Sequence, residues 1–235
     1  ELKITTAFMI DSTGTETDSI VETTLMAGLA DYLPSDREIS RQQFNERFVL
    51  ESITVQPTIA DDIKNRAIVA TIVALIGIFL YILLRFKKWQ FSVGALAALA
   101  HDVLIVLGIY SLLHGLLGFS MEIDQPFIAA ILTVIGYSIN DTVIVFDRVR
   151  EVIGDNSKRG LIENTNEAIN LTLSRTLITS GTTLLVLLVL FLFGGEAIRG
   201  FSFAILLGVL VGTYSSIFVA TPVMTDLTKK SEGKA

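Results

Sequence analysis

The sequence predicts an α-helical polytopic membrane protein with a small α+β domain in front of five transmembrane helices. Of its 235 residues, 51% are hydrophobic and only 18% are charged, against about 25% charged residues in soluble domains. After residue 65 come five apolar stretches, each near the roughly 20 residues that cross a hydrocarbon core of about 30 Å. The alternative is a soluble protein in which the five stretches are buried core helices. Such a protein would have too few polar helix faces to expose to water.

Residues 1–62 are predicted to form the α+β domain. Apolar residues alternate with period two over 2–8, as in a half-buried strand. Residues 16–33 are predicted to form a helix with one apolar stripe, ended by Pro34, and residues 48–55 a second strand. About sixty residues bury little surface alone, so we expect another segment or chain to complete the sheet.

The transmembrane bundle is predicted over residues 63–228, followed by a cytoplasmic tail at 229–235. Its spans are expected at about 67–84, 91–113, 126–147, 176–194 and 201–225.

The Lys and Arg residues predict the orientation of these spans, because short cytoplasmic loops are enriched in them. They gather in alternate loops and in the tail: Arg85, Lys87 and Lys88; Arg148, Arg150, Lys158 and Arg159; Lys229, Lys230 and Lys234. The intervening loops, 114–125 and 194–200, contain one Lys or Arg between them, Arg199. We therefore expect the N-terminal domain in the periplasm of a double-membrane bacterium and the spans in its inner membrane. We also expect a further helix before Glu1, which would make the sequence a fragment.

Several classes of function are not supported by the composition. The chain has no cysteine, and its two histidines, His101 and His114, are thirteen residues apart. Disulfides, thiol chemistry and a metal site are therefore not expected. There is no Walker motif, and a net charge of −6 does not suggest nucleic acid as a partner. We expect a protein without enzymatic activity and without a cofactor.

Asp141 is the most informative residue of the third span. An Asp near the middle of a membrane helix costs about 2.5 to 3.5 kcal/mol, and such residues usually face a bundle interior or an aqueous path. If Arg148 marks the cytoplasmic interface, Asp141 lies seven residues deeper, which is roughly 10 Å at about 1.5 Å per residue. Tyr137 shares its helix face, and Asn140 is its neighbour in the sequence.

Three more ionisable residues are expected at a similar depth. His101 and Asp102 enter the membrane thirteen and fourteen residues after Lys88, and Arg175 opens the fourth span, from which it can reach toward Asp141. A carboxylate, an arginine and an imidazole at one level suit an ion or proton relay. A static buried ion pair that fixes the helix register is the alternative, and the sequence leaves both open.

The last span carries a small residue at every fourth position: Gly200, Ala204, Gly208, Gly212, Ser216 and Ala220. Small residues let membrane helices approach closely. We expect Gly208, Gly212 and Ser216 to pack against another helix, either as a static contact or as a surface along which helices slide.

The run of residues 136–148, GYSINDTVIVFDR, resembles the signature of the SecF family. Further pieces match in order: Arg85 with Phe86, His101 with Asp102, Ser174 to Thr176 followed by Thr179 and Ser180, and Gly212 to Ser216. The resemblance covers about residues 55 to 225. SecF is one half of the SecD/SecF protein-export motor, within the resistance-nodulation-division (RND) superfamily.

The resemblance implies a six-helix bundle of which the first helix is missing here. It implies that Asp141 is the ion-coupling carboxylate, that Arg175 is the arginine of the same path, and that Asp102 belongs to the family's His-Asp pair. The implied partners are SecD, as a separate or fused chain, the SecYEG translocon, an exported preprotein and membrane lipid. The implied activity is the use of an H⁺ or Na⁺ gradient to promote polypeptide translocation across the inner membrane.

Two alternative functions remain open from the residues. An RND-type exporter of small molecules would use the same ion path, although about sixty outer residues leave little room for a ligand cavity of about 300 to 1,000 Å³. A scaffold that stabilises partner subunits without transport would need no ionisable residues in the membrane. Replacing Asp141 with Asn separates the scaffold, which would keep its function, from both transport functions, which would be lost.

Overall fold

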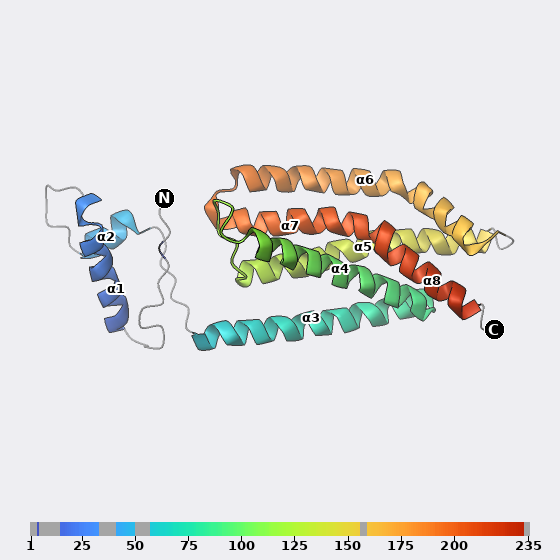
Figure 1. Ribbon diagram of the computed structural model, residues 1–235, viewed down its shortest axis with the longest axis horizontal. Helices are drawn as coiled ribbons and strands as arrows, with labels where there is room; N and C mark the ends of the chain where they lie inside the picture. The colour runs from blue at the N-terminus through green and yellow to red at the C-terminus, as the bar shows by residue number, and fades with distance from the viewer. Residues whose placement is uncertain (1–3, 5–14, 33–40, 50–56, 156–158, 233–235) are drawn as a thin grey trace. The chain divides into compact units, whose positions relative to one another are not determined.

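The computed structural model describes residues 4, 15–32, 41–49, 57–155 and 159–232. The chain divides into two compact units, Glu1–Arg66 and Ala67–Ala235. Every regular element among the described residues is a helix (Figure 1).

The first unit contains two short α-helices and a 3₁₀ turn within its described residues: α1 (Thr15–Gly28), η1 (Ala30–Tyr32) and α2 (Arg41–Phe48). The two α-helices contact each other, since Nδ2 of Asn45 donates a hydrogen bond to Oε1 of Glu22 over 2.9 Å. Phe44 of α2 is buried and its ring contacts that of Phe48.

The helix predicted at 16–33 is present, but its α-helical part ends at Gly28 and is followed by the 3₁₀ turn. Glycine is among the least favourable residues inside a helix, which explains this earlier end. The strand predicted at 2–8 lies outside the described residues except for Ile4, which has no regular structure. The strand predicted at 48–55 was wrong for Phe48, which ends α2, and residues 50–56 lie outside the described part. The described residues contain no strand, so the α+β architecture stays a prediction.

The remaining elements are long helices and one π-helical turn: α3 (Pro57–Phe86), α4 (Trp89–Leu113), α5 (Gln125–Asp155), α6 (Leu161–Phe193), α7 (Glu196–Ser215), η2 (Ser216–Ala220) and α8 (Thr221–Glu232). As predicted, five helical stretches of the described chain are long and apolar enough to cross a membrane: Asn65–Phe86, Trp89–Leu113, Gln125–Asp155, Leu161–Phe193 and Ile198–Ser231.

Two helices run well past the predicted spans. α5 continues to Asp155 rather than ending near 147, and α6 begins at Leu161 rather than near 176. The added turns are polar, so a search for apolar runs finds the lipid-spanning part of each helix but misses its extension.

The helix ends have local causes. The side chain of Asp124 accepts a hydrogen bond from the backbone N–H of Phe127 over 2.9 Å, which satisfies one free donor at the start of α5. α3 and α4 are separated at Lys87, whose φ of 58° interrupts the helix. α6 ends before Gly195, whose φ of 79° is a conformation that glycine adopts without strain.

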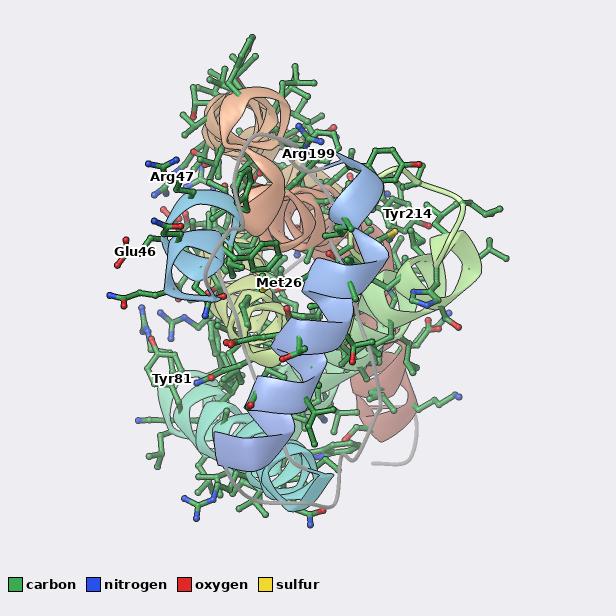
Figure 2. The ribbon with its side chains drawn as sticks, turned by 90° about the vertical axis from the view of Figure 1, so that its left-hand side faces the viewer. Met26, Glu46, Arg47, Tyr81, Arg199 and Tyr214 are labelled. Atoms are coloured by element: carbon green, nitrogen blue, oxygen red, sulfur yellow. The ribbon has the colours of Figure 1, made fainter. Side chains whose placement is uncertain are left out.

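Within the second unit, α5 and α7 form the centre and contact α4 and α6 on either side (Figure 1). In the apolar 18-residue stretch of α5, 44% of the residues are buried, against 6% in that of α3 and 11% in that of α6. The exposed faces of these helices are apolar, with side chains such as Leu84 and Phe193, as expected where lipid is the solvent. Tyr81 and Tyr214 also lie on the outside of the helices (Figure 2).

Two glycines allow α7 to approach α5 closely. A Cβ atom added to Gly212 would lie 2.9 Å from Cβ of Ser138, and one added to Gly208 would overlap the side chain of Val134. Both contacts lie on the stripe of small residues in the last span, and Ser216 of the same stripe is buried.

Candidate ion-coupling site

Two carboxylates are buried among the described residues of the bundle. Asp102 on α4 and Asp141 on α5 are each only 1% exposed. We call them the α4 carboxylate and the α5 carboxylate. Burying an ionised carboxylate away from water is costly unless hydrogen bonds or opposite charges compensate it, so the surroundings of each one are informative.

The α5 carboxylate is only partly compensated. Oγ of Ser180 on α6 lies 3.2 Å from Oδ2 of Asp141 and donates a hydrogen bond to it. Oγ1 of Thr213 on α7 lies 2.7 Å from Oγ of Ser180, so one chain of hydroxyls joins α5, α6 and α7. Oδ1 of Asp141 is buried without a hydrogen-bond partner among the described residues. This oxygen is therefore available to a proton or a small cation.

The α4 carboxylate is fully engaged. Its Oδ2 accepts hydrogen bonds from Oγ of Ser138 on α5 over 2.6 Å and from Oγ of Ser215 on α7 over 2.8 Å. Its Oδ1 lies 3.1 Å from Nδ1 of His101. His101 is partly exposed, and its ring lies beside that of Tyr214. The two buried carboxylates thus differ: one has partners on both oxygens and the other on one.

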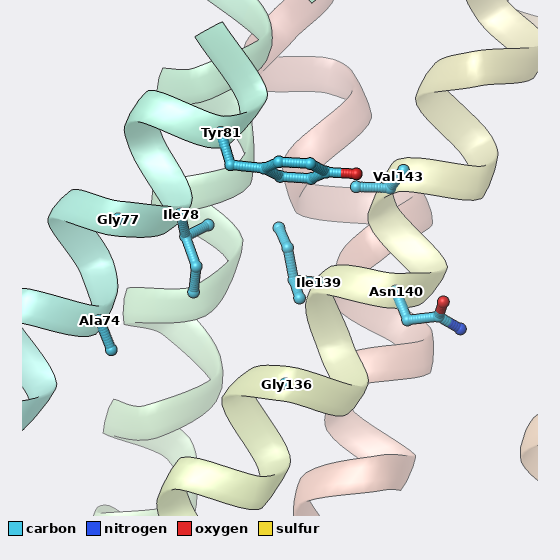
Figure 3. A pocket seen from close by; sticks show the side chains of 8 residues that line it. All are labelled: Ala74, Gly77, Ile78, Tyr81, Gly136, Ile139, Asn140 and Val143. Carbon is cyan, nitrogen blue, oxygen red and sulfur yellow. The ribbon is translucent and has the colours of Figure 1, made fainter. Parts of the chain in front are cut away.

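The structure places Tyr137 and Asn140 apart from this chemistry. The hydroxyl of Tyr137 donates to Oγ1 of Thr183 on α6 over 3.2 Å. Asn140 is exposed and lines a cavity of about 550 Å³ between α3 and α5. Tyr81 reaches across this cavity from α3 toward Val143 (Figure 3). Within the described part of the chain, neither Tyr137 nor Asn140 forms a hydrogen bond to the α5 carboxylate.

Arg175 and Asp141 form no ion pair within 4.0 Å in this structure. Arg175 is exposed and lines a cavity of about 330 Å³ between α5 and α6. The other charged residues of this cavity belong to α5: Asp147, Arg148 and Glu151. Arg148 is already paired with Glu151 over 2.6 Å.

A second group of charges lies at the same end of the bundle. Asp147 pairs with Arg85 of α3 over 3.1 Å and with Arg150 over 3.2 Å. Both guanidinium groups also lie over the ring of Phe86, 5.7 and 5.4 Å from its centre. These side chains are partly exposed, as expected for residues at the membrane interface.

Sequence reasoning found both carboxylates and placed the hydroxyls that contact them in the motifs that resemble the family, but it assigned none of these to a carboxylate: Ser138, Ser180, Thr213 and Ser215. One signal was available, because Ser138 lies one turn before Asp141 on the same helix. The partners on other helices could not be assigned without knowing how the helices pack.

Comparison with known proteins identifies the family. The family model described as "Protein export membrane protein SecD/SecF, C-terminal" matches residues 37–230. The chain belongs to the SecD/SecF family. The resemblance inferred from residues 136–148 is thereby confirmed.

Curated members of the SecD/SecF family are similar over most of the chain. Protein translocase subunit SecF of Rhodothermus marinus is 55% identical over 199 residues, covering 84% of this chain and 64% of the relative. The protein of the same name from Thermodesulfovibrio yellowstonii is 47% identical over 186 residues, covering 78% and 60%. The chain thus spans about three fifths of the length of these two relatives.

Solved SecDF structures share the fold. The crystal structure of SecDF, a translocon-associated membrane protein, from Thermus thermophilus is 40% identical with a TM-score of 0.68. The alignment covers 84% of this chain and 27% of that one. SecDF in a super-membrane-facing form is 38% identical with a TM-score of 0.67, covering 86% and 27%.

Proposed function

We propose that the chain is part of a SecF-type subunit of the Sec protein-export machinery, which uses a proton or sodium gradient to promote polypeptide translocation across the bacterial inner membrane. The relatives named protein translocase subunit SecF support this proposal. The observation that carries the ion-coupling part is the α5 carboxylate, Asp141, which is buried and has one oxygen without a partner among the described residues.

The chemistry of this carboxylate suggests how an ion would be coupled to movement. A proton or Na⁺ on Oδ1 of Asp141 would neutralise the buried charge and weaken its attraction for the hydroxyl of Ser180. Because Ser180 and Thr213 link α5 to α6 and α7, ion occupancy would change the contacts among three helices. Arg175 would respond to the charge of Asp141 from the adjoining cavity.

The rest of the arrangement follows from the distribution of charge. Residues 1–62 would lie in the periplasm and 229–235 in the cytoplasm, because the basic residues favour this orientation. The periplasmic domain would move with the bundle and act on an exported preprotein that leaves the SecYEG translocon. SecD, as a separate or fused chain, would complete the assembly.

The test is export driven by an ion gradient in membrane vesicles that contain the full-length protein. Asp141→Asn keeps the size of the side chain but removes its charge, and we expect export to fall at least about tenfold with normal assembly. Asp155→Asn on the same helix is the matched control, since Asp155 is exposed at the end of α5, and it should retain export. Normal export by Asp141→Asn, with the gradient as the only driving force, would contradict the proposal.

A further inference from the structure

We propose that the α4 carboxylate, Asp102, is a positioning residue for the α5 carboxylate rather than a second ion-carrying group. This inference rests on the proposed role of Asp141 in ion coupling. Among the described residues, the hydrogen bonds of the cluster around Asp102 do not include Asp141, so this cluster acts on Asp141 through α5 and α7.

The first step concerns the partners of Asp102, which occupy both oxygens of its carboxylate. Two hydroxyls on different helices, those of Ser138 and Ser215, converge on the same oxygen, and His101 lies against the other. The carboxylate is 1% exposed, as is Ser138, and Ser215 is 0% exposed. A carboxylate whose two oxygens already have polar partners has little to gain from binding an ion, whereas the two hydroxyl bonds to Oδ2 hold α4, α5 and α7 together.

The second step is where these hydroxyls lie along the chain. Ser138 precedes Asp141 by three residues on α5, so the two share a helix face. Ser215 follows Thr213 by two residues on α7, and Thr213 contacts Ser180, the donor to Asp141. The α4 carboxylate therefore holds both the helix that carries the α5 carboxylate and the helix that supports its hydrogen-bond donor.

The third step is the tightness of the contact between these helices. Gly212 of α7 faces Ser138 so closely that no Cβ would fit without a shift. Interfaces packed in this way move as units rather than deform gradually. Loss of a hydroxyl bond to the α4 carboxylate would thus change the distance between α7 and α5, and with it the surroundings of Asp141.

The experiment follows Asp141 directly. Dicyclohexylcarbodiimide reacts with protonated carboxyl groups in apolar surroundings, so the extent of its reaction with Asp141 against pH gives a titration profile. The profile is measured by peptide mass spectrometry on the purified full-length protein in lipid nanodiscs, with Asp141→Asn to identify the labelled site. Ser138→Ala and Ser215→Ala each remove one hydroxyl and little volume. We expect each to displace the midpoint of the profile by about one pH unit.

Ser202→Ala is the matched control. Ser202 is also buried on α7, but within the described part of the chain its hydroxyl donates to the backbone oxygen of Ile198 in its own helix and to no carboxylate. The Asp141 profile of Ser202→Ala should therefore match that of the wild type. Asp102→Asn should displace the midpoint in the same direction as the two serine variants.

Thermal unfolding of each variant is measured alongside. If Ser138→Ala and Ser215→Ala lower the melting temperature while the Asp141 profile stays in place, Asp102 is only a structural contact and the inference is wrong. A reaction at Asp102 itself that competes with Asp141 would also overturn it. The profile is recorded without export, so a failed export test of Asp141→Asn would leave this result standing, and a failed positioning test would leave the export result standing.

Discussion

Gly212 of α7 and Ser138 of α5 face each other at a distance that leaves no room for a side chain on the glycine. A Cβ atom at position 212 would lie 2.9 Å from Cβ and 3.2 Å from Oγ of Ser138. Because Ser138 also bonds to the α4 carboxylate, this contact joins helix packing to the polar interior of the bundle.

Gly212→Leu should therefore separate α7 from α5 and destabilise the bundle by about 2 kcal/mol or more. Gly108→Leu is the control, because a Cβ on this exposed glycine of α4 would meet no atom within 4 Å. Unfolding in detergent, together with recovery of the assembled complex, measures both. A stable, fully assembled Gly212→Leu protein would show that the contact tolerates separation.

Asp141→Asn should impair export without destabilising the protein. A buried pair that loses one partner is destabilised by about 3 to 5 kcal/mol, but Asp141 and Arg175 form no such pair here, and Arg175 is exposed. We expect Arg175→Gln to change the free energy of unfolding by less than about 1 kcal/mol, because this side chain is exposed. We expect Asp141→Asn not to lower it, because a neutral amide replaces a buried charge that is only partly compensated. The double variant should unfold like the single variants and should remain inactive. Rescue of export in the double variant would instead favour a static pair.

At the end of α3, two neighbouring residues should differ in how much each stabilises the protein. Phe86 is buried, stacks on Phe91 with ring centres 4.9 Å apart, and meets the ring of Phe146 edge-on. Phe86→Ala should cost about 3 kcal/mol because it leaves a cavity. Arg85→Gln breaks a partly exposed ion pair with Asp147 and should cost less than about 1 kcal/mol. Chemical unfolding of the two variants measures both losses of stability. A larger loss for Arg85→Gln than for Phe86→Ala would mean that the ion pair, rather than ring packing, stabilises this end of α3.

The orientation can be tested by labelling with a membrane-impermeant thiol reagent. The chain has no cysteine, so each introduced thiol reports one position. Ser120→Cys, between α4 and α5, should react from the periplasmic side of intact spheroplasts, and Asp155→Cys, at the end of α5, should react only after the membrane is opened. Reaction of Asp155→Cys in intact spheroplasts would show that the orientation is opposite to the predicted one.

The five spans could be predicted from the sequence because soluble domains rarely contain apolar runs of about 20 residues, whereas a helix that crosses a membrane requires one. The two carboxylates could be located for the same reason, since an acidic residue inside such a run is conspicuous. Their donors could not. Serine and threonine in membrane helices commonly bond to the backbone of their own helix, as Ser202 and Thr179 do here, and Ser215 looks no different in the sequence.

The position of Arg175 shows a second limit. Its place at the start of the predicted span made a contact with Asp141 plausible, but α6 begins fourteen residues earlier, at Leu161. The arginine therefore lies within a continuous helix, where the direction of its side chain depends on rotation about the helix axis. Apolar periodicity does not determine that rotation for a helix whose apolar 18-residue stretch is only 11% buried.

The π-helical turn η2 has a geometric consequence for the last span. In an α-helix, each step of four residues overshoots a full turn by about 40°, so a stripe with a spacing of four winds gradually around the helix and would leave the interface. A π-helical turn holds more residues, so the step from Ser216 to Ala220 falls short of a full turn and rotates the stripe back. Met224 and Thr228, four and eight residues further on, are buried as a result. The π-helical turn therefore keeps the buried residues of η2 and α8 on the same side of the helix as the stripe before them. Inserting or deleting one residue within the turn would rotate α8 about its own axis and turn its buried side away from the bundle.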